Sequence, residues 1–194
     1  IRLMNVLKDK FPLHNLKRSA SIMESLRSIK QDGEVSLMQT ASDITDDTFR
    51  KILSFVKPGV MEYEVEAEII ANFIRNRANG HAYSPIIASG ASACVLHYVE
   101  NNRECKDGDL LLMDFGAEYG NYAADMTRTI PVNGKFTKRQ KKVYNAVLKV
   151  MQEATQMLRP GTNVNKYHKE VGKIMESELI RIGLLDKTDV KNQS

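Results

Sequence analysis

Apolar residues recur along this chain with two different periods, and the period indicates which segments form helices and which form strands. Four segments carry apolar positions three or four residues apart, which predicts amphipathic helices over 34–56, 62–78, 137–158 and 164–182. The segments that are rich in β-branched, aromatic and other apolar residues predict short strands over 83–87, 94–99, 110–113 and 122–129. Two helices are therefore expected before the strands and two after them.

The two helix pairs are built alike. A basic residue, a proline and a glycine join the helices of each pair, at 57–59 and again at 159–161. The second helix of each pair ends before a glycine, Gly80 or Gly183. The separation of these two glycines is nearly the same as the separation of the two prolines, Pro58 and Pro160. The pattern indicates duplicated halves, each with two helices followed by strands, so we expect the strands of the second half beyond Gly183 and outside this sequence.

Residues 1–30 mix basic and apolar positions at roughly helical spacing, without a turn signal before 31–33. This segment is predicted to be a linker helix.

The segment LLLMDFGAEYGNYAADMTRT, residues 110–129, predicts a β-hairpin that turns near Tyr119 and Gly120. In that register Asp114 faces Asp125, Leu112 faces Thr127 and Gly116 faces Ala123. Two opposed carboxylates repel each other, and a divalent cation between them would compensate the charge. The alternative is a register shifted by one residue, which would place the two carboxylates on opposite faces of the sheet.

The composition bounds the class of protein. The 194 residues are 42% hydrophobic and 27% charged, as in one globular domain, and no apolar run approaches the length of a membrane span. The basic stretch KFTKRQKK at a helix start favours a solvated face over a nucleic-acid site. Cys94 and Cys105 have no metal-binding spacing, so we interpret them as reduced thiols of a cytoplasmic protein. Neither a nucleic-acid partner nor a membrane is expected.

Three motifs carry a resemblance to a known family: YSPIIASGASACVLHYVEN, DGDLLLMDFGAEYGNYAADMTRTIPVNGKF and LRPG. From about Gln31 onward the chain resembles the Xaa-Pro aminopeptidase (aminopeptidase P) branch of the pita-bread metallopeptidases. The resemblance implies an α+β pita-bread fold with duplicated halves around a curved antiparallel sheet, the second half being truncated here. Residues 31–194 would be the N-terminal two-thirds of the catalytic domain, and 1–30 the connection from a missing N-terminal domain.

The resemblance also implies two divalent metal ions, usually Mn²⁺, with Zn²⁺ or Co²⁺ as alternatives, held by two Asp, one His and two Glu. Asp114 and Asp125 match the two Asp ligands, with Asp125 expected to bridge the ions and Asp114 to chelate one of them. The family's HGTSH-like segment and both of its Glu ligands do not occur in this sequence.

Three further residues are candidates for the site. By itself a lone histidine among apolar residues, such as His97, is more often structural than catalytic. The resemblance reverses this preference, because His97 matches the family's histidine that hydrogen-bonds the reacting amide. Tyr83 matches a tyrosine near the metals. The Thr127 hydroxyl either orients Asp125 or belongs to a residue that merely suits a strand.

The implied reaction is removal of the N-terminal residue from peptides with proline in second position. Two alternatives stay open: a prolidase that cleaves only dipeptides, and a non-catalytic pita-bread module that binds other molecules. A homodimer is compatible with this interpretation. Since three of the five ligands are missing, we expect the 194-residue chain alone to be inactive and to bind metal poorly.

Overall fold

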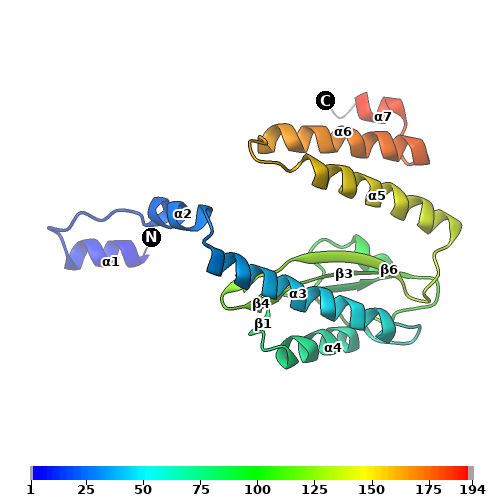
Figure 1. The fold of residues 1–194 in the computed structure, drawn as a ribbon, viewed down its shortest axis with the longest axis horizontal. Helices are drawn as coiled ribbons and strands as arrows, with labels where there is room; N and C mark the ends of the chain where they lie inside the picture. Colours follow the sequence, from blue (N-terminus) through cyan, green and yellow to red (C-terminus); the bar gives the residue numbers. More distant parts are fainter. Residues whose placement is uncertain (1, 192–194) are drawn as a thin grey trace. The chain divides into compact units, whose positions relative to one another are not determined.

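The computed structural model describes residues 2–191 and confirms an α+β chain in which helix pairs precede and follow the strands (Figure 1). The helices are α1 (Arg2–Lys10), α2 (Ala20–Ser28), α3 (Asp32–Phe55), α4 (Glu62–Arg75), α5 (Lys138–Met157), α6 (Val164–Ile182) and α7 (Lys187–Lys191). The strands are β1 (Gly80–His81), β2 (Ile86–Ser89), β3 (Leu110–Phe115), β4 (Ala117–Tyr119), β5 (Tyr122–Ala123) and β6 (Met126–Pro131), and a 3-10 helix η1 (Gly90–Cys94) follows β2.

The chain divides into two compact units, each assembled from segments that are distant in sequence. The first unit combines the residues up to 53 with 67–85 and 114–127. The second unit combines 54–66, 86–113 and the residues from 128 onward. Asp114, Asp125, Tyr83 and Thr127 therefore all belong to the first unit, whereas His97 belongs to the second.

In the first unit, a three-stranded sheet has the order β1-β4-β5, and both pairs are antiparallel. Its core contains the fully buried Phe73 of α4 and Phe115 of β3, whose ring centroids lie 6.2 Å apart. Ala41, Ile44 and Ile52 of α3 are also buried. Burial at positions three and eight residues apart on α3 is the amphipathic pattern from which the helix was predicted.

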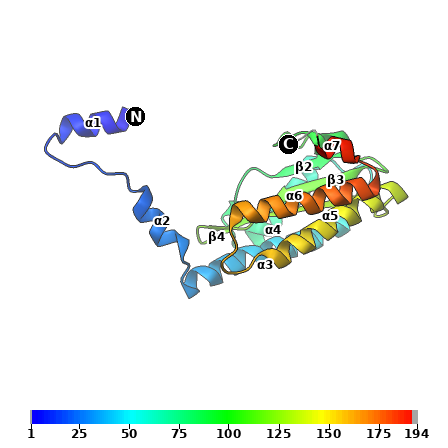
Figure 2. The same ribbon diagram turned by 90° about the horizontal axis from the view of Figure 1, so that it is seen from above.

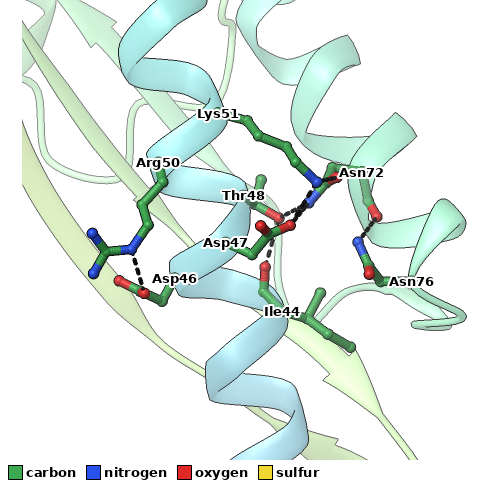
Figure 3. Close-up of polar contacts among 8 residues, drawn as sticks. All are labelled: Ile44, Asp46, Asp47, Thr48, Arg50, Lys51, Asn72 and Asn76. Atoms are coloured by element: carbon green, nitrogen blue, oxygen red, sulfur yellow. Dashed lines mark hydrogen bonds and ion pairs between the residues drawn. The ribbon is translucent and has the colours of Figure 1, made fainter.

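A polar cluster joins α3 to α4 within this unit (Figure 3). The Asn72 side chain is almost fully buried, and its Nδ2 donates to Thr48 Oγ1 at 2.7 Å and to Asp47 Oδ2 at 3.1 Å. Lys51 Nζ donates to Asn72 Oδ1 at 2.7 Å and also pairs with Asp47. Because a buried amide without partners would cost free energy, these bonds specify how the two helices pack.

In the second unit, most residues of β2, β3 and β6 form a sheet of order β2-β3-β6, and α5 and α6 lie side by side (Figure 2). The first turn of α5 carries the predicted capping box: Thr137 Oγ1 accepts from Gln140 N–H, and the Gln140 side chain accepts from Thr137 N–H. Two cations of the basic stretch, Arg139 and Lys142, donate to the Ile182 carbonyl at the end of α6. At least part of this stretch therefore stabilises a helix C-terminus.

The Glu178 carboxylate also stabilises the contact between α5 and α6. The Glu178 carboxylate of α6 is nearly inaccessible, and it accepts from Lys149 Nζ of α5 at 2.8 Å and from Arg181 Nη2 at 2.6 Å. The hydrogen bonds from Arg181 and then Lys149 lower the pKa of Glu178 below its ordinary range. The carboxylate is therefore ionised at neutral pH and paired with two cations.

The structure corrects the prediction of one helix over 1–30, where α1 and α2 are separate. Pro12 disfavours the helical conformation at Phe11, which helps to end α1 at Lys10. The two cysteines are not paired with each other: Cys94 is exposed, and burial raises the pKa of the Cys105 thiol to about 11. Across residues 2–191, no helix has the length and apolar character needed to cross a membrane.

Candidate metal site

The Asp114 and Asp125 carboxylates meet at one phenol. Tyr83 Oη donates to Asp114 Oδ1 at 2.6 Å and lies 3.2 Å from Asp125 Oδ1. Both carboxylates are therefore directed into the same space, as predicted, and the register that would send them to opposite faces is excluded.

Tyr83 itself lies in a bend between β1 and β2, not in the strand predicted over 83–87. Burial, followed by the hydrogen bond to Asp114 and the negative charges of both Asp, raises the pKa of Tyr83 far above its ordinary range. The phenol is thus a hydrogen-bond donor at neutral pH. One donor shared by two acids holds them together but neutralises neither of them.

The predicted register of the hairpin is wrong at its tip. Ala123 pairs with Glu118, not with Gly116, and the turn consists of Gly120 and Asn121. These two residues have φ of 57° and 67°, as in the type I′ turn that suits two-residue hairpins. Because the partners shift by two residues, an even number, each side chain keeps its face, and the expected convergence survives.

Gly116 allows a close backbone crossing between the two Asp. A Cβ at this position would lie 1.8 Å from the Ala124 carbonyl oxygen, so any side chain would push the two backbone segments apart. Next to it, Ala117 N–H donates to Thr45 Oγ1 of α3 at 3.0 Å, and Ala124 N–H donates to the Ala117 carbonyl at 2.9 Å. The hairpin is thereby held against α3 at the position from which Asp114 and Asp125 project.

His97 is not in a strand, which corrects the prediction for 94–99. The segment after η1 is a turn in which His97 is exposed and has a φ of 55°, a left-handed value incompatible with an extended strand. The apolar residues Val95 and Leu96 before it are 56% and 88% exposed, so their hydrophobicity reflects no strand burial within this chain. Whether His97 faces the carboxylates stays a prediction.

Thr127 is an exposed residue near the start of β6, and its contact with Asp125 also stays a prediction. Within the described chain, no cluster of three or more His, Cys, Asp or Glu side chains is suited to a metal ion. The donors at the hairpin are therefore two carboxylates. Carboxylate oxygens suit Mn²⁺ and other hard or borderline divalent ions, but two residues provide only part of a coordination shell.

Comparison with known proteins defines the class to which this hairpin belongs. Residues 36–191 match the model of metallopeptidase family M24, which covers most of the chain, and the chain belongs to that family.

The similarity is strong to one branch of the family. The chain is 40% identical to the Xaa-Pro aminopeptidase of Escherichia coli over 169 residues, which is 87% of this chain and 38% of that protein. A structure of Glu383Ala E. coli aminopeptidase P in complex with substrate superposes with a TM-score of 0.84 at 39% identity, covering 87% of this chain and 38% of the other. A structure of the Zn-substituted E. coli enzyme in complex with product superposes with a TM-score of 0.80 at 40% identity, covering 83% of this chain and 37% of the other. The fold is therefore that of aminopeptidase P, and the chain spans less than half the length of these relatives.

Sequence reasoning missed two contributors to the local structure. Gly116 could have been singled out as a glycine within the predicted hairpin, since a glycine between paired strands often marks a close backbone approach. Glu62 begins the helix predicted over 62–78, yet its side chain is fully buried in the second unit. The sequence around Glu62 does not indicate that this side chain is buried.

Proposed function

We propose that the full-length protein is an Xaa-Pro aminopeptidase that removes the N-terminal residue from peptides with proline in second position. The observation that carries this proposal is the convergence of Asp114 and Asp125 on the Tyr83 hydroxyl, in a chain of a metallopeptidase family. The similarity to E. coli aminopeptidase P, of which one structure is described as a complex with substrate, supports a peptide substrate.

Asp114 and Asp125 would hold divalent metal. The donor set fits, because two anionic oxygen ligands face one space. We expect two ions, with Mn²⁺ first and Zn²⁺ or Co²⁺ as alternatives, and the Zn-substituted relative supports at least the zinc alternative. Bound metal would supply a water of lowered pKa and polarise the scissile carbonyl.

The other candidate residues orient groups or stabilise charge. Tyr83 fixes the two carboxylates through its hydrogen bonds and borders the substrate site, and Thr127 orients Asp125. His97 donates a hydrogen bond to the reacting amide and stabilises the negative charge that develops on its oxygen. The bond before proline is a tertiary amide without an N–H, so recognition depends on the ring and not on a backbone donor.

The test uses the full-length protein, metal-depleted and then reloaded with Mn²⁺. Steady-state rates are measured on an Xaa-Pro-Xaa tripeptide, the matching Xaa-Ala-Xaa tripeptide and the Xaa-Pro dipeptide. An aminopeptidase P cleaves the first far faster than the second and also accepts longer peptides. Activity confined to the dipeptide would establish a prolidase, and no cleavage of any substrate with metal bound would favour the non-catalytic module.

The same assay applied to the 194-residue chain tests whether two carboxylates suffice. We propose that this chain is the N-terminal two-thirds of the catalytic domain, follows an N-terminal domain and is inactive alone. Rates comparable to those of the full-length protein would contradict this. A cytoplasmic location and a homodimer remain parts of the proposal, to be checked by fractionation and by light scattering.

A further inference from the structure

Glu62, the first residue of α4, is a buried carboxylate in the second unit whose partners are neutral donors. Its Oε1 accepts from Ser89 N–H at 2.7 Å, and its Oε2 accepts from Tyr98 Oη at 2.7 Å and from Arg103 N–H at 2.9 Å. Its side chain is fully inaccessible. Burying a carboxylate costs free energy unless hydrogen bonds compensate, and three donors converging on one group compensate it here.

These donors lie at both ends of one loop. Ser89 ends β2, whereas Arg103 lies beyond the turn that carries His97. The Glu62 N–H also donates to the Arg103 carbonyl at 2.8 Å, so backbone and side chain of Glu62 bind the same residue. The carboxylate therefore closes the loop at its base.

A second acid one helical turn later strengthens this closure. Asn101 Nδ2 donates to Glu66 Oε2 at 2.8 Å, and Asn101 Oδ1 accepts from Ile87 N–H at 2.9 Å. The Asn101 side chain is nearly inaccessible. The start of α4 thus holds both β2 and the returning segment of the loop through Glu62 and Glu66.

His97 projects from this loop next to an anchored residue. It is exposed and has left-handed backbone geometry, which a residue other than glycine adopts only where its surroundings enforce it. Val95 and Leu96 are largely exposed and provide little anchoring, whereas Tyr98 is 5% exposed and bonded to Glu62. Burial and this hydrogen bond raise the pKa of Tyr98, so its hydroxyl is a donor at neutral pH.

We propose that Glu62 is a positioning residue whose carboxylate, through the Tyr98 hydroxyl, fixes the turn that presents His97 to the substrate. This inference rests on the proposed function, because it requires that His97 acts on the peptide. It goes beyond that function in assigning Glu62 and Tyr98 a role in the rate of reaction without contact with substrate or metal.

The test is a double-mutant cycle in the full-length, Mn²⁺-loaded protein. Tyr98→Phe removes one hydroxyl and leaves Glu62 its two backbone donors, so the protein is expected to fold. We expect kcat to fall about 10-fold, with KM and metal content unchanged, because misplacing a reacting group costs rate more than binding. Tyr63→Phe is the matched control, since Tyr63 is 54% exposed on α4 and should retain full activity.

The second part of the experiment distinguishes an effect of Tyr98 on the position of His97 from a general effect on the stability of the fold. His97→Ala should lower kcat roughly 10² to 10³-fold, the effect of losing one transition-state donor. In that background Tyr98→Phe should have no further effect on kcat. Glu62→Gln replaces one of the two acceptor oxygens with an NH₂ group, which cannot accept a hydrogen bond from the surrounding donors. It should follow the same pattern, with a larger loss of kcat than Tyr98→Phe in the protein that retains His97.

The outcomes distinguish this inference from the proposed function. Failure of the parent protein to cleave Xaa-Pro peptides would overturn the proposed function and this inference with it. A parent that is active and slowed by His97→Ala, but whose kcat is unaffected by Tyr98→Phe, would overturn the inference alone. Equal losses in the two backgrounds would also overturn it, because they would show an effect that does not pass through His97.

Discussion

Carboxylates are held in opposite ways in the two units. Glu62 in the second unit is fully buried, and two backbone N–H groups and one phenol bind it. Asp114 and Asp125 in the first unit share the single Tyr83 hydroxyl, and Asp125 is exposed. A carboxylate has about four lone-pair sites, so Glu62 is nearly saturated, whereas the pair can still accept a cation. The same chemical group thus fixes a loop in one unit and provides a candidate ligand site in the other.

Removing Asp114 or Asp125 should have the largest effect on metal binding and activity. In the full-length protein, Asp125→Ala should abolish Mn²⁺ binding and lower kcat/KM by more than the roughly 100-fold typical of groups outside the coordination shell. Metal content after gel filtration and rates on an Xaa-Pro-Xaa peptide measure this. Asp46→Ala is the control, since it removes an equal charge from the exposed pair with Arg50 in Figure 3. A variant at Asp125 that keeps metal and full activity would end the ligand assignment.

Removing the shared donor should have a smaller effect. Tyr83→Phe keeps the ring but loses the hydroxyl that orients both carboxylates, so Mn²⁺ affinity should fall about 10- to 100-fold. Titration against a chelating indicator measures the affinity, with Tyr119→Phe on β4 as the control. Unchanged affinity in Tyr83→Phe would show that the carboxylates need no such orientation.

Gly116 and Gly172 offer a pair of substitutions with opposite expected signs. Gly116→Ala would place a Cβ against the Ala124 carbonyl and should destabilise the protein by roughly 1–3 kcal/mol, with loss of metal affinity as the hairpin moves. Gly172 lies within α6, and apart from the adjacent backbone of its own helix no atom lies within 4 Å of an added Cβ, so Gly172→Ala should stabilise by up to about 1 kcal/mol. Chemical denaturation measures both, and equal effects would contradict the close crossing.

Replacing Glu178 should have the smallest effect of these substitutions. Its carboxylate lies between two cations, Lys149 and Arg181, which is a third environment for a carboxylate in this chain. Its pKa is lowered in the folded protein, so it binds fewer protons there than in the unfolded chain. Its contribution to stability is therefore present above the ordinary pKa of a glutamate and is lost as the pH falls through the lowered value. Glu178→Gln should lower Tm at pH 7, and the difference from the parent should shrink towards pH 3. A difference independent of pH would assign the effect to packing.

Periodicity was sufficient for much of the fold, because each long helix buries one face. The four predicted helices correspond to α3, α4, α5 and α6, and the capping box at Thr137 fixes the start of α5. The convergence of Asp114 and Asp125 was also predictable, since side chains alternate along a strand and an even error in register preserves the face.

The remaining features depend on contacts that a linear pattern does not contain. An apolar run such as 94–99 reads as a strand, but the left-handed backbone at His97 excludes an extended conformation there. The turn at Gly120 and Asn121 was misplaced by one residue because Gly120 could occupy either of the two central positions of the turn. The role of Glu62 depends on three donors from distant segments, which only the folded chain brings together.

Anomalous diffraction from crystals of the full-length protein grown with Mn²⁺ tests the central claim most directly. Data collected above and below the manganese absorption edge locate the ions without reference to activity. We predict two anomalous peaks at the hairpin, with Asp125 contacting both ions and Asp114 contacting one of them. Manganese peaks only at other positions, with Tyr83 still bonded to both carboxylates, would contradict the assignment of Asp114 and Asp125 as metal ligands.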